Sequence, residues 1–275
     1  MKYNNEEVYQ ICHRNRHHYW VRANNLTKEH ATSYSERENL MRLLRWLAYL
    51  YVKDVKDKNI VLGGEDENKE RLIKIIKYIT RFSEEYIRKS RRLLKRYVKP
   101  LEKSRSLLFL TLTISFNDFE TIEEGAKWSQ RQKNSLLTEL RKRGILPYYV
   151  SITEVQEKHT KNIHFHILIL NEVNENGRIK EIISVKEFEE IVKRNWKYIF
   201  KIEKISSELK ENGRPDKKYI IGYLGKYLKK SMMSSEEGFF NDTMIILWAL
   251  DMRVMSCSRK KPDEGVKEDL IGISP

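Results

Sequence analysis

Two histidines, His164 and His166, stand on either side of Phe165 in the apolar run NIHFHILIL, residues 162 to 170. Successive side chains of a β-strand point to opposite faces of its sheet, so the two histidines share one face. The residues that follow are apolar on both faces, which is typical of a central strand covered on both sides. Two neighbouring imidazoles on a rigid strand can supply two metal ligands. Ordinary hydrogen-bonded core histidines are the alternative.

The sequence around this run predicts an α+β fold with a central antiparallel sheet flanked by helices. Segments rich in β-branched and aromatic residues predict strands at residues 106–116, 148–155, 163–170 and 252–259. Apolar residues at helical spacing predict helices at residues 121–144, 184–200 and 217–230. The first of these helices should end at Gly144, and the second should begin with a capping box formed by Ser184 and Glu187.

The first hundred residues have a different texture, which predicts helices. One helix should begin at a capping box of Ser35 and Glu38. A second long helix should follow Gly63 and Gly64 and end at Pro100, with its apolar stripe at Ile75, Ile79, Phe82 and Tyr86. We therefore predict three regions: a helical, basic accessory or DNA-binding region at 1–104, a site-bearing domain at 105–262 and a C-terminal tail at 263–275.

The charge of the chain favours a polyanionic partner. Lys and Arg number 53 against 39 Asp and Glu, a net charge of +14 at pH 7, and nucleic acid is the usual partner of such a protein. We see neither an apolar signal region nor a run of 18 apolar residues, so we expect a cytoplasmic protein without a membrane partner. The two cysteines, Cys12 and Cys257, lie too far apart in sequence to imply a disulfide framework.

A third metal ligand is predicted on the strand that precedes the histidines. A hairpin with its loop centred near His159 places Glu154 opposite His164, and opposed residues have Cβ atoms roughly 4.5–5.5 Å apart. Two imidazoles and one carboxylate with open positions suit Mn²⁺ or Mg²⁺, with Zn²⁺ as an alternative. In another register, Glu157 or His159 would take the place of Glu154.

The segment YIIGYLGKYLKK carries tyrosines at helical spacing. Tyr223 and Tyr227 lie four residues apart on one helix face, and Lys226 and Lys230 each follow a tyrosine by three residues. A phenol can act as a covalent nucleophile. Its pKa near 10 means that it needs a neighbouring charge, such as a lysine, to ionise at neutral pH. Packing in the core is the alternative for such a stripe.

The blocks FLTLT, IHFHILIL and YLGKYLKK, in this order, resemble the HUH endonuclease superfamily. They look most similar to rolling-circle replication initiator (Rep) proteins of bacteriophages, plasmids and archaeal viruses, over residues 106–260. The resemblance implies that His164, His166 and Glu154 bind the metal and that Tyr223 is the nucleophile beside Lys226. It also implies that Tyr227 is a second, alternating nucleophile.

The reaction that the resemblance implies is metal-dependent nicking and joining of single-stranded DNA at a replication origin. A 5′-phosphotyrosine link and a free 3′-hydroxyl result. Partners would be single-stranded and origin DNA, with a host helicase and polymerase as further candidates, and the oligomeric state stays open. A transposase or relaxase of the same fold would share this chemistry, and a non-catalytic sequence-specific DNA-binding protein is an alternative of another class. A histidine-triad hydrolase would need a third histidine where Leu168 stands.

A basic helix face precedes the first strand of the site-bearing domain. Its residues follow helical spacing and are predicted to contact the phosphates of origin DNA, together with Lys230. The members of this face are Arg88, Arg91, Arg92, Lys95, Arg96 and Lys99. An ordinary solvated helix face is the alternative.

Overall fold

The histidine-bearing run forms strand β5, Ile163–Leu170, at the centre of a five-stranded sheet. The computed structural model describes residues 18–55, 58–65, 71–102, 104–155, 162–175, 178–206, 217–232 and 241–258. The α+β fold with an antiparallel sheet and a helical N-terminal region is confirmed. The tail predicted at 263–275 lies outside the described residues.

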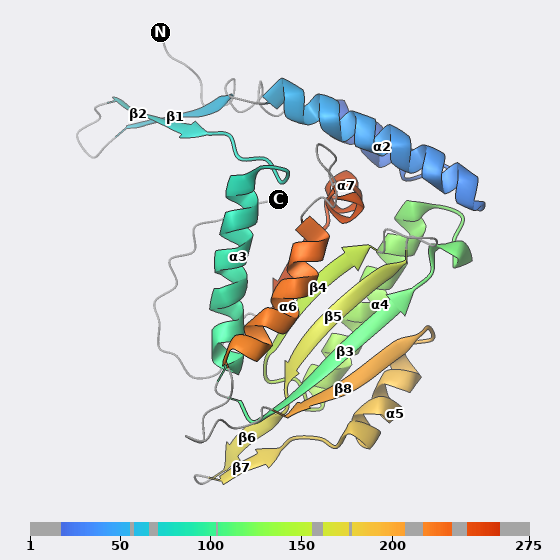
Figure 1. Cartoon of the computed structure of the whole chain (residues 1–275), viewed down its shortest axis with the longest axis vertical. Coiled ribbons are helices and arrows are strands. Elements are labelled where there is room, and N and C mark those ends of the chain that lie inside the picture. Colours follow the sequence, from blue (N-terminus) through green and yellow to red (C-terminus); the bar gives the residue numbers. More distant parts are fainter. Residues whose placement is uncertain are drawn as a thin grey trace.

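All neighbouring strands of this sheet run antiparallel, in the order β8-β3-β5-β4-β9 (Figure 1). The strands beside β5 are β3, Ser106–Ile114, and β4, Tyr149–Val155; the outer strands are β8, Phe200–Ser206, and β9, Met255–Cys257. The central strand is therefore paired on both edges and covered on both faces, as its apolar sequence predicts.

Helices form a layer on each face of the sheet (Figure 1). One face is covered by α4, Ile122–Lys142, and α5, Val185–Asn195; the other by α6, Lys217–Met232, and α3, Glu84–Val98. Helix α2, Tyr34–Val55, lies across one end of the sheet beside the short helix α7, Asp242–Ala249, and residues 18–26 are also helical. No helix in the described part of the chain is both long and apolar enough to cross a membrane.

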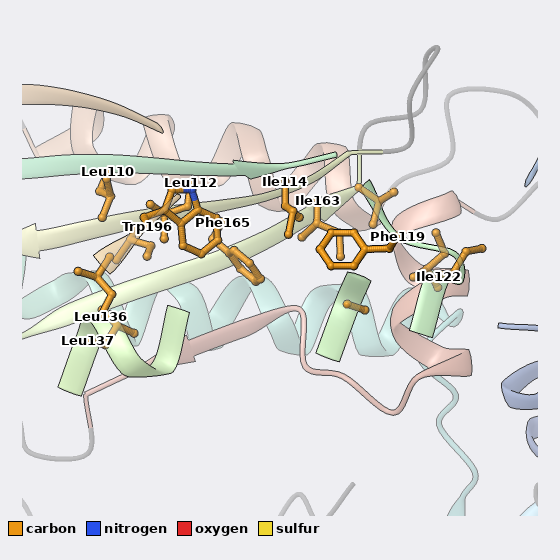
Figure 2. Packing of buried hydrophobic residues seen from close by; sticks show 14 of the residues in the cluster. Leu110, Leu112, Ile114, Phe119, Ile122, Leu136, Leu137, Ile163, Phe165 and Trp196 are labelled. Carbon is orange, nitrogen blue, oxygen red and sulfur yellow. The ribbon is translucent and has the colours of Figure 1, made fainter. Parts of the chain in front are cut away.

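The alternation of strand side chains creates two cores. Phe165 and the odd-numbered residues of β5 pack with Leu136 and Leu137 of α4 and with Trp196, as Figure 2 shows. On the other face, Phe109 and Leu168 pack with helices α3 and α6. The histidines, at even positions of β5, lie on this second face and so beneath the tyrosine-bearing helix.

A β-hairpin replaces the first half of the second N-terminal helix, and that part of the prediction is wrong. Strands β1, Asn59–Glu65, and β2, Arg71–Lys77, pair antiparallel, and α3 begins only at Glu84 after the N-cap Ser83. The segment RLIKIIK is rich in isoleucine and short, so its strand preference outweighs the helical spacing of Ile75, Ile79 and Phe82.

Other element boundaries also differ from the predictions. The capping box of α2 is formed by Ser33 and Glu36, one residue pair earlier than Ser35 and Glu38, because the Ser33 amide and the Glu36 carboxylate bond each other reciprocally. The helix predicted to reach residue 200 ends at Asn195, and residues 200–206 form β8 instead. The capping box of Ser184 and Glu187 is confirmed, as is the end of α4 at Gly144, whose φ is 71°.

A second hairpin and one helix were not predicted from the sequence. The hairpin is formed by β6, Glu172–Glu175, and β7, Arg178–Glu181, at the end of β5, and the helix is α7. Both are short, and short elements give weak periodic signals.

Lys133 of α4 is buried, with its ammonium 4.5 Å from the centre of the Phe165 ring, and burial lowers its pKa to about 8. The ordinary value is 10.5. Between these two values the unfolded chain binds the proton and the folded chain does not, so folding stability rises with pH across this window. We expect Lys133→Met to be more stable than the wild type at pH 7, by up to about 3 kcal/mol. The difference should shrink as pH rises towards 10.5. Urea unfolding at pH 7 and pH 10 checks this, and an equal difference at both values would contradict it.

Candidate active site

The hairpin register brings the predicted carboxylate to the histidine pair. Glu154 on β4 pairs directly with His164 on β5, as expected for a loop centred near His159. The Nε2 atom of His166 lies 2.8 Å from Oε2 of Glu154, within hydrogen-bonding distance. The alternative residues, Glu157 and His159, lie outside the described residues.

Two threonines on the other neighbouring strand orient the imidazoles. Thr111 and Thr113 of β3 pair with His166 and His164, and their hydroxyls lie 3.3 and 3.2 Å from the Nδ1 atoms of these histidines. A hydroxyl can donate to or accept from Nδ1. When Nδ1 bonds to a hydroxyl, Nε2 is the nitrogen that can coordinate a metal.

The donor set fits a divalent cation, although the side chains do not form a finished ion cage. Among the described residues, no group of three His, Cys, Asp or Glu side chains already converges closely enough to hold an ion. The His166 nitrogen and the Glu154 oxygen, 2.8 Å apart, are spaced as two adjacent ligands of one ion with bonds of about 2.1 Å would be. The Cβ of His164 projects to the same face, so a side-chain rotation could bring in its Nε2 as a third ligand.

Helix α6 places a tyrosine against the histidine pair. The ring of Tyr227 stacks on that of His166, with centroids 3.7 Å apart and planes 25° apart, and it also stacks on Phe109. Tyr223, predicted to be the first nucleophile, lies on the same helix one turn earlier, about 5.4 Å along the axis. Its side chain lies outside the described part of the chain.

Three lysines are relevant to this face. Lys226 is exposed on α6, and the side chain of Lys230 lies outside the described part. Lys201 of β8 pairs with Thr111 and therefore shares the sheet face of the histidines. A hydrogen bond to Glu203 is the largest cause that raises the pKa of Lys201, and the nearby phenol of Tyr227 adds a smaller contribution. A lysine charge thus lies near the phenol, on a strand that was not predicted.

The basic face predicted on the second N-terminal helix lies on α3, which packs beside α6 (Figure 1). Ser90, Leu94 and Val98 form its buried side. The basic side chains on the opposite side are all exposed: Arg88, Arg91, Arg92, Lys95, Arg96 and Lys99. Arg88 lies 3.9 Å from Glu85 on the same helix.

The threonines were missed as site residues, although a signal was present. The block FLTLT places Thr111 and Thr113 at the same two-residue spacing as the histidines. Threonine is common in strands, so this spacing carries meaning only when it faces a second polar pair across the sheet. Lys201 was missed because residues 196–200 were predicted as the end of a helix.

Removing the hydroxyls should weaken metal binding without removing a ligand. We expect Thr111→Val to lower the Mn²⁺ affinity by roughly 10- to 100-fold, because the ring of His166 loses the bond that orients it. Isothermal titration calorimetry measures this affinity. The matched control is Thr138→Val on the exposed side of α4, where the hydroxyl donates only to a helix carbonyl. Equal affinities in Thr111→Val and the wild type would contradict the orienting role.

The fold and the site define an α+β protein in which a histidine pair, a facing carboxylate and a tyrosine meet on one face of an antiparallel sheet. Residues 107–232, which run from β3 to the end of α6, match the family model of the replication-associated protein ORF2. This match supports a protein of the replication-initiator (Rep) type. No curated protein and no solved structure matches the chain.

Proposed function

We propose that this protein is a replication initiator that nicks and rejoins single-stranded DNA at an origin through a tyrosine. The observation that carries the proposal is the contact of Tyr227 with His166, which itself bonds to Glu154. A potential nucleophile and a potential metal site therefore touch each other. The match to a replication-associated family supplies the substrate class.

In this proposal, His164, His166 and Glu154 hold a divalent cation, Mn²⁺ or Mg²⁺. Such a cation, when bound, polarises the scissile phosphate and fixes its orientation. Thr111 and Thr113 hold the imidazole rings in place, and Lys201 favours the ionised form of the phenol.

The reaction is a transesterification that conserves one phosphodiester bond. The phenol oxygen attacks phosphorus, and a bond from the tyrosine to the 5′-phosphate of the downstream strand forms. The bond from phosphorus to the 3′ oxygen breaks, and the proton lost by the phenol is balanced by the proton gained by that oxygen. The reverse attack by a 3′-hydroxyl rejoins the strand, so no nucleotide is consumed.

Both tyrosines of α6 are assigned a role. The spacing of Tyr223 and Lys226 favours Tyr223 as the nucleophile of the first cleavage. The contact of Tyr227 with His166 supports a position beside the same phosphate site, where Tyr227 can act in a second cleavage while Tyr223 still holds the first strand. Packing of Tyr227 on Phe109 and His166 is the structural alternative.

The proposal is tested by incubating the protein with a library of single-stranded oligonucleotides, in Mn²⁺ or in EDTA, and separating the products on a denaturing gel. We expect cleavage at a preferred sequence in Mn²⁺ and none in EDTA. A transposase or relaxase would also cleave, and the family match favours the initiator. Tight, sequence-specific binding without any cleavage in either condition would instead favour the non-catalytic DNA-binding protein.

The basic face of α3 is proposed to hold origin DNA beside this site. Each lost phosphate contact lowers the log–log salt slope of duplex binding by roughly one unit. Replacing Arg91, Arg92, Lys95 and Arg96 together by glutamine should therefore flatten the slope by up to about four units, while a short single strand at saturating concentration is still cleaved. Fluorescence anisotropy over a salt series measures this.

A matched variant tests whether the position of these charges matters. It removes four exposed basic residues from α4 and α5, on the opposite face of the sheet: Arg131, Arg141, Lys142 and Arg194. We expect this variant to keep most of the wild-type slope. Equal slopes in the two variants would return α3 to the status of an ordinary solvated face.

A further inference from the structure

Helix α2 has an apolar stripe on the side that faces solvent. Leu43, Trp46 and Tyr49 follow one another at helical spacing, and 49%, 57% and 47% of their respective surfaces are exposed. The opposite side of α2, including Leu44 and Ala48, is fully buried. The exposed rings are therefore not part of the core, and exposed aromatic clusters of this kind commonly mark binding surfaces.

The two rings already form a stacked platform. The centroids of Trp46 and Tyr49 lie 5.7 Å apart, with planes at 22°. Arg42 and Lys53 are exposed at the two ends of the stripe, and neither forms an ion pair within the described residues. The sequence holds no Asp or Glu from residue 39 to residue 53. The face therefore combines aromatic rings with unneutralised cations.

These features favour a single-stranded nucleic acid over a protein partner. Bases stack on aromatic side chains, and Lys and Arg at the edge of the platform contact the phosphates. The charge of the stripe complements a polyanion, whereas a second copy of this basic chain would bring together like charges.

The platform is attached to the candidate active site through α7. Arg45, the residue before Trp46, forms a bidentate pair with Asp242 at distances of 2.9 and 2.8 Å. The hydroxyl of Thr243 bonds the backbone of Val155, which follows Glu154 at the end of β4. A short series of buried polar contacts thus fixes α2 relative to the end of the sheet that carries Glu154.

We propose that the outer face of α2 is a second single-stranded DNA site, in which bases stack on Trp46 and Tyr49 and phosphates contact Arg42 and Lys53. The inference rests on the proposed function only for its partner, DNA, and it requires no cleavage. Its role is to hold single-stranded DNA next to the nicking site, which adds affinity through a second contact on the same strand.

The test separates aromatic stacking from simple apolar contact. One variant carries Trp46→Leu and Tyr49→Leu, and its matched control carries Trp46→Phe and Tyr49→Phe. Both pairs keep an apolar surface, but only the second keeps ring faces. Affinity for a fluorescently labelled oligothymidylate is measured in EDTA, where no metal-dependent cleavage takes place. Thermal unfolding confirms that each variant folds.

We expect the leucine pair to lose roughly 10-fold or more in affinity, and the phenylalanine pair to lose less than about 3-fold. Unchanged affinity in the leucine pair, or equal loss in both pairs, would overturn the proposal. So would dissociation of a wild-type oligomer by the leucine pair with no change in DNA affinity, because that result assigns the face to a second copy. If the leucine pair weakens binding but the wild-type protein never cleaves DNA, the nicking function fails and this site stands.

Discussion

Replacing Tyr223 and Tyr227 together by phenylalanine is expected to abolish the covalent protein–DNA adduct. Only two hydroxyl groups are lost, and the ring of Tyr227 can still stack on His166, so the fold and DNA affinity should be nearly unchanged. A phosphotyrosyl link needs a phenol oxygen, and phenylalanine has none. A denaturing gel with labelled single-stranded DNA measures the adduct.

The single variants divide the roles of the two tyrosines. We expect the wild-type adduct on Tyr223 and the adduct of Tyr223→Phe on Tyr227, as located by mass spectrometry of the DNA-linked peptide. The control is Tyr34→Phe, a tyrosine exposed at the start of α2. An adduct that persists in the double variant would place the nucleophile elsewhere. An adduct that never appears on Tyr227 would leave that residue a packing role.

Removing either histidine is the second change with a large expected effect. We expect His164→Ala and His166→Ala to lower the nicking rate by roughly 10³-fold or more, since several kcal/mol of charge stabilisation are lost with the metal. Excess Mn²⁺ should restore little activity because a ligand itself is missing. The nicking rate is measured under single-turnover conditions at saturating DNA.

A surface histidine provides the matched control for these variants. His30 is exposed and lies 3.5 Å from Glu120, far from β5 in sequence. His30→Ala should nick at the wild-type rate. Wild-type nicking by His166→Ala would show that the pair is an ordinary hydrogen-bonded one and would contradict the metal site.

The sequence predicts the centre of this fold well because strand alternation is a strict rule. A single pairing, Glu154 with His164, follows from the length of the hairpin, and it fixes the face and position of every neighbouring residue. The helix ends at Ser184 and Gly144 follow from local capping chemistry, which does not depend on the rest of the fold.

The edges of the fold are harder to predict because their signals are weak or depend on tertiary contacts. The β1–β2 hairpin replaced a helix because isoleucine-rich segments satisfy both patterns over a short length. Strand β8 was hidden because residues 196–200 continue the apolar pattern of α5. The roles of Thr111, Thr113 and Lys201 appear only once β3 and β8 are placed beside β5, which requires long-range pairing.

The most direct measurement of the central claim is the polarity of the covalent adduct. Wild-type protein is incubated with Mn²⁺ and with single-stranded DNA that is labelled at its 5′ end or at its 3′ end, and the products are separated under denaturing conditions. A 5′-phosphotyrosine intermediate predicts that the 3′ label migrates with the protein and that the 5′-labelled fragment carries a free 3′-hydroxyl that a polymerase extends. Migration of the 5′ label with the protein, or cleavage without any adduct, would contradict the claim.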